Sequence, residues 1–511
     1  MHFRPPISLL LGLFALVVCA IVNPGNFGTI DTCRRLQAER WIRLGEPPVR
    51  PIDVTEFGLT GRNGVVHPWY GVGQSLVLLP FDWLVSTTVT PRLEGFGLDS
   101  EKQHQVTDLL ISFLMQTALT CALLLLARAL LASFGFSPFA AAAGAVSLLL
   151  GTTCLQYVQC AQENELLLVL ALAALLSIRR WETSEAWRWA VAAGAASGFA
   201  VLVRLPSLLE SAAFAAFALA GGGCRKRFLA AWLPPVAAGV MVDRWYQWLR
   251  FGDWFSTYMS ILRQQRRPPG LPASFPFSYP FGKGFLGALV SPDKSVLLFD
   301  PLLVVLAAVA VWQWSALDRR LRVALVSLAA LLLSYDAVYA SYFDFGGDVA
   351  WGHRFLTLPV QLLALFAVPL LVEARRRIPR AAVGVAWAGL AFSVALQVVS
   401  TTMAPNVEII QRDAGAPHSV VRNRVANLAD VVTGKVDEQR FAGIPKEWRT
   451  LNYFPFQLRF RYPRLATWAI AGWWMLVACV PVLVWAVLNI SRHPVVACTT
   501  REPEVSRPRR C

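Results

Sequence analysis

Two cations in this sequence stand directly before long apolar runs. Lys294 precedes the run that begins near residue 296, and Arg354 precedes the run that begins near residue 355. A cation at the amino-terminal end of a helix, where backbone N–H groups lack partners, favours an anion. Arginine offers a planar fork that matches phosphate, and lysine offers a point charge. The two positions predict an anion-binding site, with contact to lipid headgroups as the alternative.

Asp31 is a candidate for acid–base chemistry. It follows the first apolar run by about eight residues. An ionisable group this close to a membrane is a candidate functional residue. The alternative is structural, because an aspartate before the helix-favouring stretch TCRRLQAE is a typical N-cap. The two roles are compatible.

Other candidates lie near the ends of apolar runs, and each has a simpler interpretation. His67, followed by Pro68, could present a ring nitrogen to a phosphate, and Trp69 and Tyr70 could line a pocket or anchor the chain at an interface. Glu163 and Arg204 are further candidates for the substrate pocket. Glu163 is expected at a hairpin tip, where a solvated turn charge is the default interpretation. Arg204 lies between two apolar runs, where it could reach lipid headgroups.

The composition predicts the class of protein in which these residues act. Of the 511 residues, 56% are hydrophobic and only 15% are charged, whereas soluble domains carry about 25% charged residues. Apolar runs of about 18 or more residues recur along the chain, which is typical of membrane-spanning helices. We therefore expect an all-α polytopic membrane protein.

The net charge of +15 does not indicate a nucleic-acid partner, because basic clusters stand at the ends of apolar runs. Such clusters mark the cytoplasmic side. They lie at 179–181, 225–227, 318–322 and 373–380. The nine cysteines include no C-x-x-C pair, so a thiolate metal site is not expected. Cys154 and Cys160 could pair or stay reduced.

About twelve spans with both termini in the cytoplasm place all four clusters on one side. The expected spans are about 7–23, 106–131, 137–155, 164–180, 188–203, 206–221, 228–246, 296–315, 322–342, 355–372, 382–400 and 467–489. The first run, which resembles a signal peptide, is expected to be retained because no A-x-A-like site follows it.

The expected organisation is a transmembrane module over 1–400, an outer segment over 401–466, and a last helix with a basic tail over 467–511. The module has long outer loops at 24–105 and 247–295. The first loop is expected to hold interfacial helices near residues 31–46 and 73–85.

Six stretches of the sequence, taken in this order along the chain, resemble a known family. They are IDTCRRLQAERWIRLGE, GVVHPWYGVGQSLVLLP, ASGFAVLVRLPSLL, RWYQWLRFGDWF, GFLGALVSPDKSVLLFDPLL and GGDVAWGHRFL. The chain is similar, from Asp31 to about residue 372, to bacterial integral-membrane glycosyltransferases of the GT-C type. That group contains the protein O-mannosyltransferases and the lipid A aminoarabinose transferase. The resemblance implies the GT-C fold and transfer of a sugar from a polyprenyl-phosphate donor outside the cytoplasmic membrane.

The resemblance also implies roles for particular residues. Asp31 matches the catalytic acidic residue of the first outer loop, and Thr32 stands where many relatives have a second acidic residue. His67 before Pro68 matches a basic residue near the lipid phosphate. Lys294 in SP-x-K and Arg354 in WG-x-R match further phosphate contacts. Trp351 is then expected to form a wall of the pocket.

The expected reaction is general-base catalysis by Asp31 on a hydroxyl of a lipid, glycan or protein acceptor, with inversion at the sugar. No cofactor is expected, and participation of a divalent metal stays open. Gly346, Gly347 and Gly352 would let the backbone approach the phosphate closely, and Asp344 and Asp348 are assigned to solvation of the loop. A twelve-helix transporter or lipid flippase, and a non-catalytic subunit of an envelope-assembly complex, are the alternatives.

Overall fold

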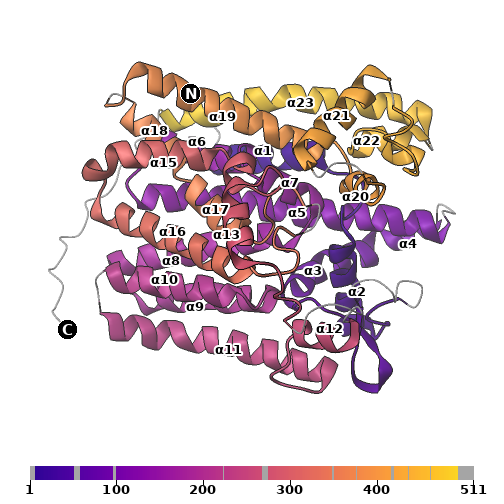
Figure 1. Ribbon diagram of the computed structural model, residues 1–511, viewed down its shortest axis with the longest axis horizontal. Helices are drawn as coiled ribbons and strands as arrows, with labels where there is room; N and C mark the ends of the chain where they lie inside the picture. The colour runs from indigo at the N-terminus through magenta and orange to yellow at the C-terminus, as the bar shows by residue number, and fades with distance from the viewer. Residues whose placement is uncertain are drawn as a thin grey trace.

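The computed structural model describes residues 6–50, 58–95, 99–221, 224–266, 274–347, 350–375, 377–415, 419–435, 437–460 and 462–492. Helices dominate these residues (Figure 1). Two three-residue strands, β1 (Gly58–Thr60) and β2 (Val66–Pro68), form one antiparallel hairpin in which Leu59 pairs with His67. The all-α class expected from the composition is confirmed.

Five helical segments of the described chain are long and apolar enough to cross a membrane. They are α5 (Ser100–Ser133), α16 (Arg319–Tyr339), α17 with α18 (Thr357–Ala364 and Ala367–Ala374), α19 (Arg380–Thr401) and α23 (Pro463–Arg492). A sixth arises if α6 (Pro138–Leu150) and α7 (Cys154–Cys160), bent by 56°, count as one span. These helices are typical of a multi-pass membrane protein.

Each of the other expected spans coincides with a helix that is shorter than the segments named above or that carries ionisable residues near its ends. They are α1 (Ile7–Val22), α8 (Glu163–Ser184), α9 (Trp187–Val203), α10 (Ser207–Gly221), α11 (Arg225–Phe251) and α15 (Leu302–Gln313). The last follows the short α14 (Val296–Phe299) after a break at Asp300 and Pro301, where the sequence predicted one unbroken helix. The count of twelve spans stays a prediction.

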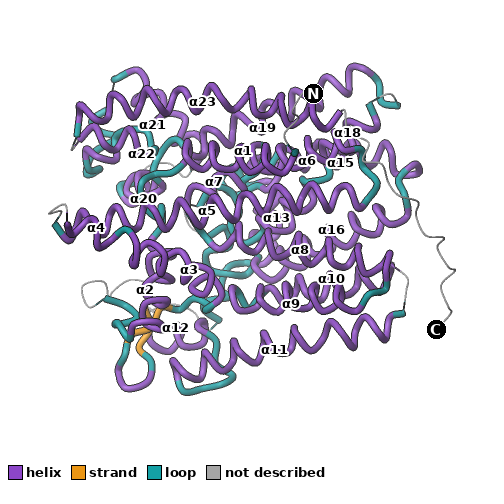
Figure 2. Tube along the Cα trace, turned by 180° about the vertical axis from the view of Figure 1, so that it is seen from behind, coloured by secondary structure: helices purple, strands orange, loops and turns teal. Residues whose placement is uncertain are grey.

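The long helices run side by side, and the shorter elements gather at one end of the bundle (Figures 1 and 2). We call this the loop end. It holds α2 (Ile30–Leu44), α3 (Gly73–Thr88), α4 (Thr90–Gly95), α12 (Tyr258–Arg266), α20 (Pro405–Asp413), α21 (Val420–Thr433) and α22 (Phe454–Gln457). The apolar α13 (Phe281–Val290) packs against α14 and α16.

The start of α1 and the end of α23 lie at the opposite end (Figures 1 and 2). The connections that carry the basic clusters meet there as well. Arg320 at the start of α16 pairs with Glu182 near the end of α8 at 3.1 Å. The backbone N–H of Ser137 before α6 donates to Glu373 in α18. This shared end agrees with the sequence pattern that placed all four clusters on one side.

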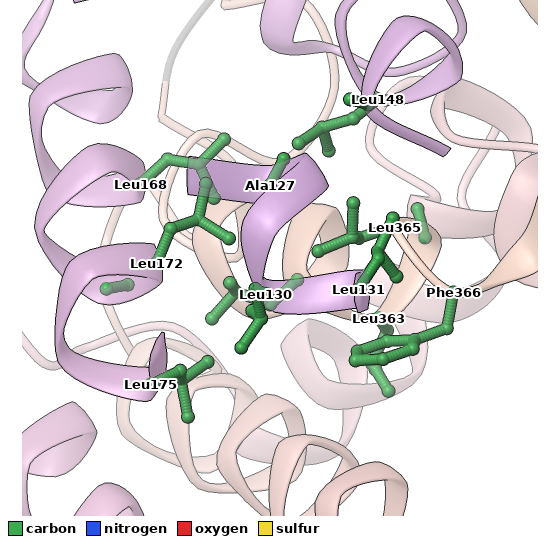
Figure 3. Close-up of a cluster of buried hydrophobic side chains, with 14 of the residues drawn as sticks. Ala127, Leu130, Leu131, Leu148, Leu168, Leu172, Leu175, Leu363, Leu365 and Phe366 are labelled. Carbon is green, nitrogen blue, oxygen red and sulfur yellow. The ribbon is translucent and has the colours of Figure 1, made fainter. Parts of the chain in front are cut away.

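The core consists of aliphatic side chains from helices far apart in sequence. Leu130 and Leu131 of α5 lie among Leu168 and Leu172 of α8 and Phe366 beside α17 (Figure 3). α9 and α11 approach more closely than such side chains would allow. A Cβ atom on Gly239 would stand 2.3 Å from the carbonyl oxygen of Gly198. Small residues at such crossings let helix backbones pack directly against each other in a membrane.

The structure corrects one expectation for the segment between α1 and α5. Helices occur where interfacial helices were predicted, but α2 buries its charges inside the protein: Arg34, Arg35 and Glu39 are 1–2% exposed. Asp82 of α3 is fully buried and accepts hydrogen bonds from Arg40, at 2.8 Å, and from Arg43. Arg40, Arg43 and Glu39 of α2 and Asp82 of α3 pair with one another, so these helices form a packed layer at the loop end.

Candidate functional site

A cavity of about 870 Å³ opens at the loop end. Its walls come from segments that are far apart in sequence: the stretch after α1, the start of α5, α7, the segment 344–347 and 350–356 before α17, and α20 with α21. We call the segment before α17 the hinge. The lining includes Asn26, Asp31, Trp69, Asp108, Gln156, Tyr157, Gln162, Trp351, Arg354, Asn406, Arg424 and Trp448. Aromatic and aliphatic side chains, amides and a few charges thus surround one hollow.

Asp31 is the second residue of α2, and its carboxylate faces other parts of the chain. Thr29 is the N-cap residue, so the N-cap interpretation of Asp31 is wrong. One oxygen of Asp31 accepts a hydrogen bond of 2.7 Å from the Tyr70 hydroxyl, and the other accepts one from Nη2 of Arg354. The side chain is 7% exposed. Two predicted site residues, Tyr70 and Arg354, therefore meet at the predicted base.

Arg354 contacts a second carboxylate. Its Nη2 lies 3.5 Å from Oε1 of Glu163, and its backbone carbonyl accepts from the Asn164 side chain at 3.2 Å. Burial alone would lower the pKa of Arg354, but the charges of Asp31 and Glu163 outweigh burial and hold that pKa well above its usual range. Arg354 therefore stays a fixed cation at any physiological pH.

Glu163 is not a solvated turn charge. It begins α8, is 5% exposed, and binds Nη2 of Arg35 at 2.9 Å. The Arg35 guanidinium lies over the Tyr70 ring, 4.1 Å from its centre. Opposite charges thus alternate along Asp31, Arg354, Glu163 and Arg35. The sequence interpretation missed Arg35, because a basic residue in an amphipathic stretch resembles a surface charge.

Lys294 plays a different part from the one expected. Its Nζ donates to the backbone carbonyls of Ala350 at 2.9 Å and Gly352 at 3.3 Å. It is 8% exposed and lies behind the cavity lining. The alkyl stem packs against Gly346, where a Cβ would come within 2.4 Å of Lys294 Cδ. Lys294 holds the hinge that carries Arg354, and nothing in this geometry supports direct contact with phosphate.

The hinge owes its shape to its glycines. Gly347 and Gly352 have φ of +77° and +72°, which side-chain-bearing residues rarely adopt. Trp351 lines the cavity and meets the Phe299 ring edge-on at 5.1 Å. Asp344 is half-buried, and Asp348 lies outside the described residues.

His67 and Arg204 lie behind the cavity lining. The His67 ring packs 4.9 Å from Trp41 and 5.9 Å from Phe251, and burial together with the charge of Arg250 lowers its pKa to about 4. A neutral, enclosed imidazole gives no support to the predicted phosphate role. Arg204 is half-buried, does not line the cavity, and donates to the Tyr339 hydroxyl at 2.9 Å. Trp69, in contrast, does line the cavity as predicted for a pocket residue.

The sequence interpretation also missed a wall made by residues 401–466. Arg424 of α21 is 1% exposed, lines the cavity and lies 5.0 Å from the centre of the Trp351 ring. Its Nε donates to Glu408 of α20 at 2.7 Å. Nothing local in the sequence distinguishes this pair from the other charges of residues 401–466.

Within the described part of the chain, no three His, Cys, Asp or Glu side chains come together as a metal site. Thr32, the residue after Asp31, is fully buried and donates to the carbonyl of Ala161 at 2.9 Å. Ala161 directly follows α7, and Thr32 is not among the residues that line the cavity. Cys154 and Cys160 are buried free thiols.

Comparison with known proteins gave no match to any family model, curated protein or solved structure.

Proposed function

We propose that this protein is a glycosyltransferase that moves a sugar from a polyprenyl-phosphate donor to an acceptor hydroxyl. The observation that carries the proposal is the direct contact between Asp31 and Arg354 in the wall of a large aromatic-lined cavity at a helix-bundle end. A carboxylate that can accept a proton and a guanidinium that can bind phosphate are thereby held within one reaction site.

Each group has a task in this reaction. Asp31 accepts the proton of the acceptor hydroxyl as its oxygen attacks the anomeric carbon, and Tyr70 orients the carboxylate. The bond between the sugar and the phosphate oxygen breaks, and Arg354 stabilises the charge that grows on the departing lipid phosphate. Trp69 and Trp351 offer ring faces for the sugar or the first prenyl units. A single displacement inverts the anomeric centre.

The distribution of buried ionisable groups favours this proposal over a transporter. Carriers tend to hold such groups near the membrane midplane on interrupted helices. Here Glu210 lies in the first turn of α10, and Asp336 lies near the end of α16. Arg204 directly follows α9. The groups collect toward the end of the bundle where the cavity opens, which suits chemistry at a membrane face.

The proposed setting is the cytoplasmic membrane, with the loop end outside and both termini in the cytoplasm. The donor enters from the lipid phase, and the acceptor is a lipid, glycan or protein with a free hydroxyl. No nucleic acid takes part.

The test is donor cleavage by the purified protein. The protein in detergent is incubated with a panel of polyprenyl-phosphate hexoses and pentoses and with a membrane extract as acceptor source, and release of polyprenyl phosphate is followed by mass spectrometry. Release from at least one donor is expected, with about a 10²–10⁴-fold loss in Asp31→Asn. Equal release by wild type and Asp31→Asn would refute the role of Asp31, and no release from any donor would refute the proposed function.

A further inference from the structure

The groups assigned to proton transfer and to phosphate binding are bound to each other. Nη2 of Arg354 donates to Asp31, and the Tyr70 hydroxyl donates to the other Asp31 oxygen. An N–H group of the guanidinium that donates to a carboxylate oxygen cannot donate to a phosphate oxygen at the same time. Either two-pronged contact of a guanidinium uses Nη2, together with Nε or with Nη1, so a phosphate that binds Arg354 with both prongs competes with Asp31 for Nη2.

We propose that a prenyl phosphate binds by replacing Asp31 on Arg354, so that donor binding comes first and releases the carboxylate for the acceptor hydroxyl. This inference rests on the proposed function, and it adds an order of events and a reason for that order. The acceptor meets a carboxylate available for proton transfer only after the donor phosphate occupies the arginine.

Arg354 is the partner whose contact changes. Its side chain is 21% exposed and faces the cavity, whereas that of Asp31 is 7% exposed and is anchored by Tyr70. Glu163, the second carboxylate at Arg354, keeps its partner Arg35 at 2.9 Å when the arginine turns away. Asp31 keeps the hydrogen bond from Tyr70, and Glu163 keeps its ion pair with Arg35, so neither carboxylate loses its last partner and the cost of the exchange stays low.

The two carboxylates compete unequally. Asp31 accepts a direct hydrogen bond from Arg354, whereas Glu163 Oε1 stands 3.5 Å from the same nitrogen. Removal of the Asp31 charge should therefore strengthen phosphate binding more than removal of the Glu163 charge. A hydrogen bond to a charged group contributes about 1.5–3 kcal/mol, which corresponds to about a 10- to 100-fold gain in affinity for Asp31→Asn.

The cavity contains a matched control. Asp108 of α5 lines the same cavity, and in the described structure Arg354 pairs with Asp31 and Glu163 rather than with Asp108. Asp108→Asn removes the same unit of negative charge from the walls without releasing Arg354. A general electrostatic effect would make the two asparagine variants alike, and competition at Arg354 would make them differ.

The experiment measures binding of farnesyl phosphate to the purified full-length protein in detergent by isothermal titration calorimetry. Farnesol and inorganic phosphate are the other two probes, because they separate the chain and the phosphate from the lipid phosphate. Each variant is first checked by thermal unfolding. Asp31→Asn is expected to bind farnesyl phosphate most tightly, and Glu163→Gln next. Wild type and Asp108→Asn should bind equally and more weakly than these two variants, and Arg354→Ala should bind most weakly. Asp31→Asn combined with Arg354→Ala should show no gain over Arg354→Ala alone.

The outcomes separate this inference from the function on which it rests. If wild type binds farnesyl phosphate through Arg354 but Asp31→Asn binds no more tightly, or Asp108→Asn gains as much, competition is refuted and the phosphate site stands. If no variant binds farnesyl phosphate, or inorganic phosphate binds equally well, a lipid-phosphate site is refuted together with the competition. If Glu163→Gln gains more than Asp31→Asn, the carboxylate that competes is not the one we assign.

Discussion

The strongest stability prediction concerns the buried ion pair between Arg424 and Glu408, which lies in the segment between α19 and α23 and borders the cavity. Arg424 is 1% exposed, and Glu408 is 2% exposed. Arg424 donates Nε and Nη2 to the two Glu408 oxygens, and Nη1 to the carbonyl of Ser400. Arg424→Met keeps most of the side-chain volume but leaves a buried carboxylate without its cation. Removing one partner of such a pair costs about 3–5 kcal/mol.

The sign of the pH dependence follows from Glu408. Burial already raises its pKa, although the charge of Arg424 opposes the rise. Without the arginine, the pKa of Glu408 in the folded state rises further above the unfolded value of about 4.3. The folded state then binds a proton that the unfolded state does not hold, so stability is lost as pH rises above about 4.3. Arg424→Met should therefore melt well below wild type at pH 8 and approach it at pH 5.

The assay is the apparent melting temperature in detergent, measured at both pH values for wild type, Arg424→Met, and Arg424→Met combined with Glu408→Gln. The double variant carries no unpaired charge at this site. Its melting temperature should therefore lie well above that of Arg424→Met at pH 8, and the difference from wild type should no longer depend on pH. A single variant that melts like wild type at pH 8, or that melts equally far below it at both pH values, would refute the assignment of an unpaired buried charge.

Three further predictions concern the hinge and the topology. Arg354→Lys should lower turnover and Arg354→Ala should lower it further, by about 10²–10³-fold, whereas a headgroup contact predicts that lysine substitutes well. Lys294→Met should destabilise the fold by about 1.5–3 kcal/mol while farnesyl phosphate still binds below the melting transition. Loss of binding at an unchanged melting temperature would instead make Lys294 a phosphate ligand. In a cysteine-depleted background, a membrane-impermeant maleimide should label Thr433→Cys on intact cells and Lys226→Cys only after permeabilisation, and the reverse pattern would invert the topology.

The sequence predicted the positions of the long helices well because hydropathy is a local property. The run at 382–400 became α19 (Arg380–Thr401), and the run at 467–489 became α23 (Pro463–Arg492). It did not predict where helices break. The bend of 56° between α6 and α7 follows a Gly151-Thr152-Thr153 stretch, and Thr153 N–H donates to Asp300 at 2.7 Å. That contact spans 147 residues, so no local pattern could reveal it.

The sequence predicted which residues belong to the site better than it predicted which of them contact each other. Asp31, Tyr70 and Arg354 were identified separately, and their meeting depends on how α2, the β2 turn and the hinge pack together. Lys294 was identified by its position before an apolar run, but that position equally suits a residue that binds the hinge carbonyls. Side-chain type and local position restrict what a residue can bind. They do not show whether the Lys294 side chain binds a ligand or a backbone carbonyl that lies 56 residues further along the chain.

The convergence of these segments follows from how a helical bundle connects its ends. In an up-and-down arrangement every second connection returns to the same end, so residues next to alternate helix ends become neighbours however far apart they are in sequence. Asp31 follows α1, and Arg354 stands between α16 and α17. Arg424 lies in the segment between α19 and α23. A cavity built this way can vary its walls through loop length and composition, because the helices bury their own apolar cores independently of it. Because the core and the cavity are built from different parts of the chain, a charged hinge can lie between two apolar runs. The runs form helices of the bundle, and the hinge places Arg354 at the end of the bundle where the cavity opens.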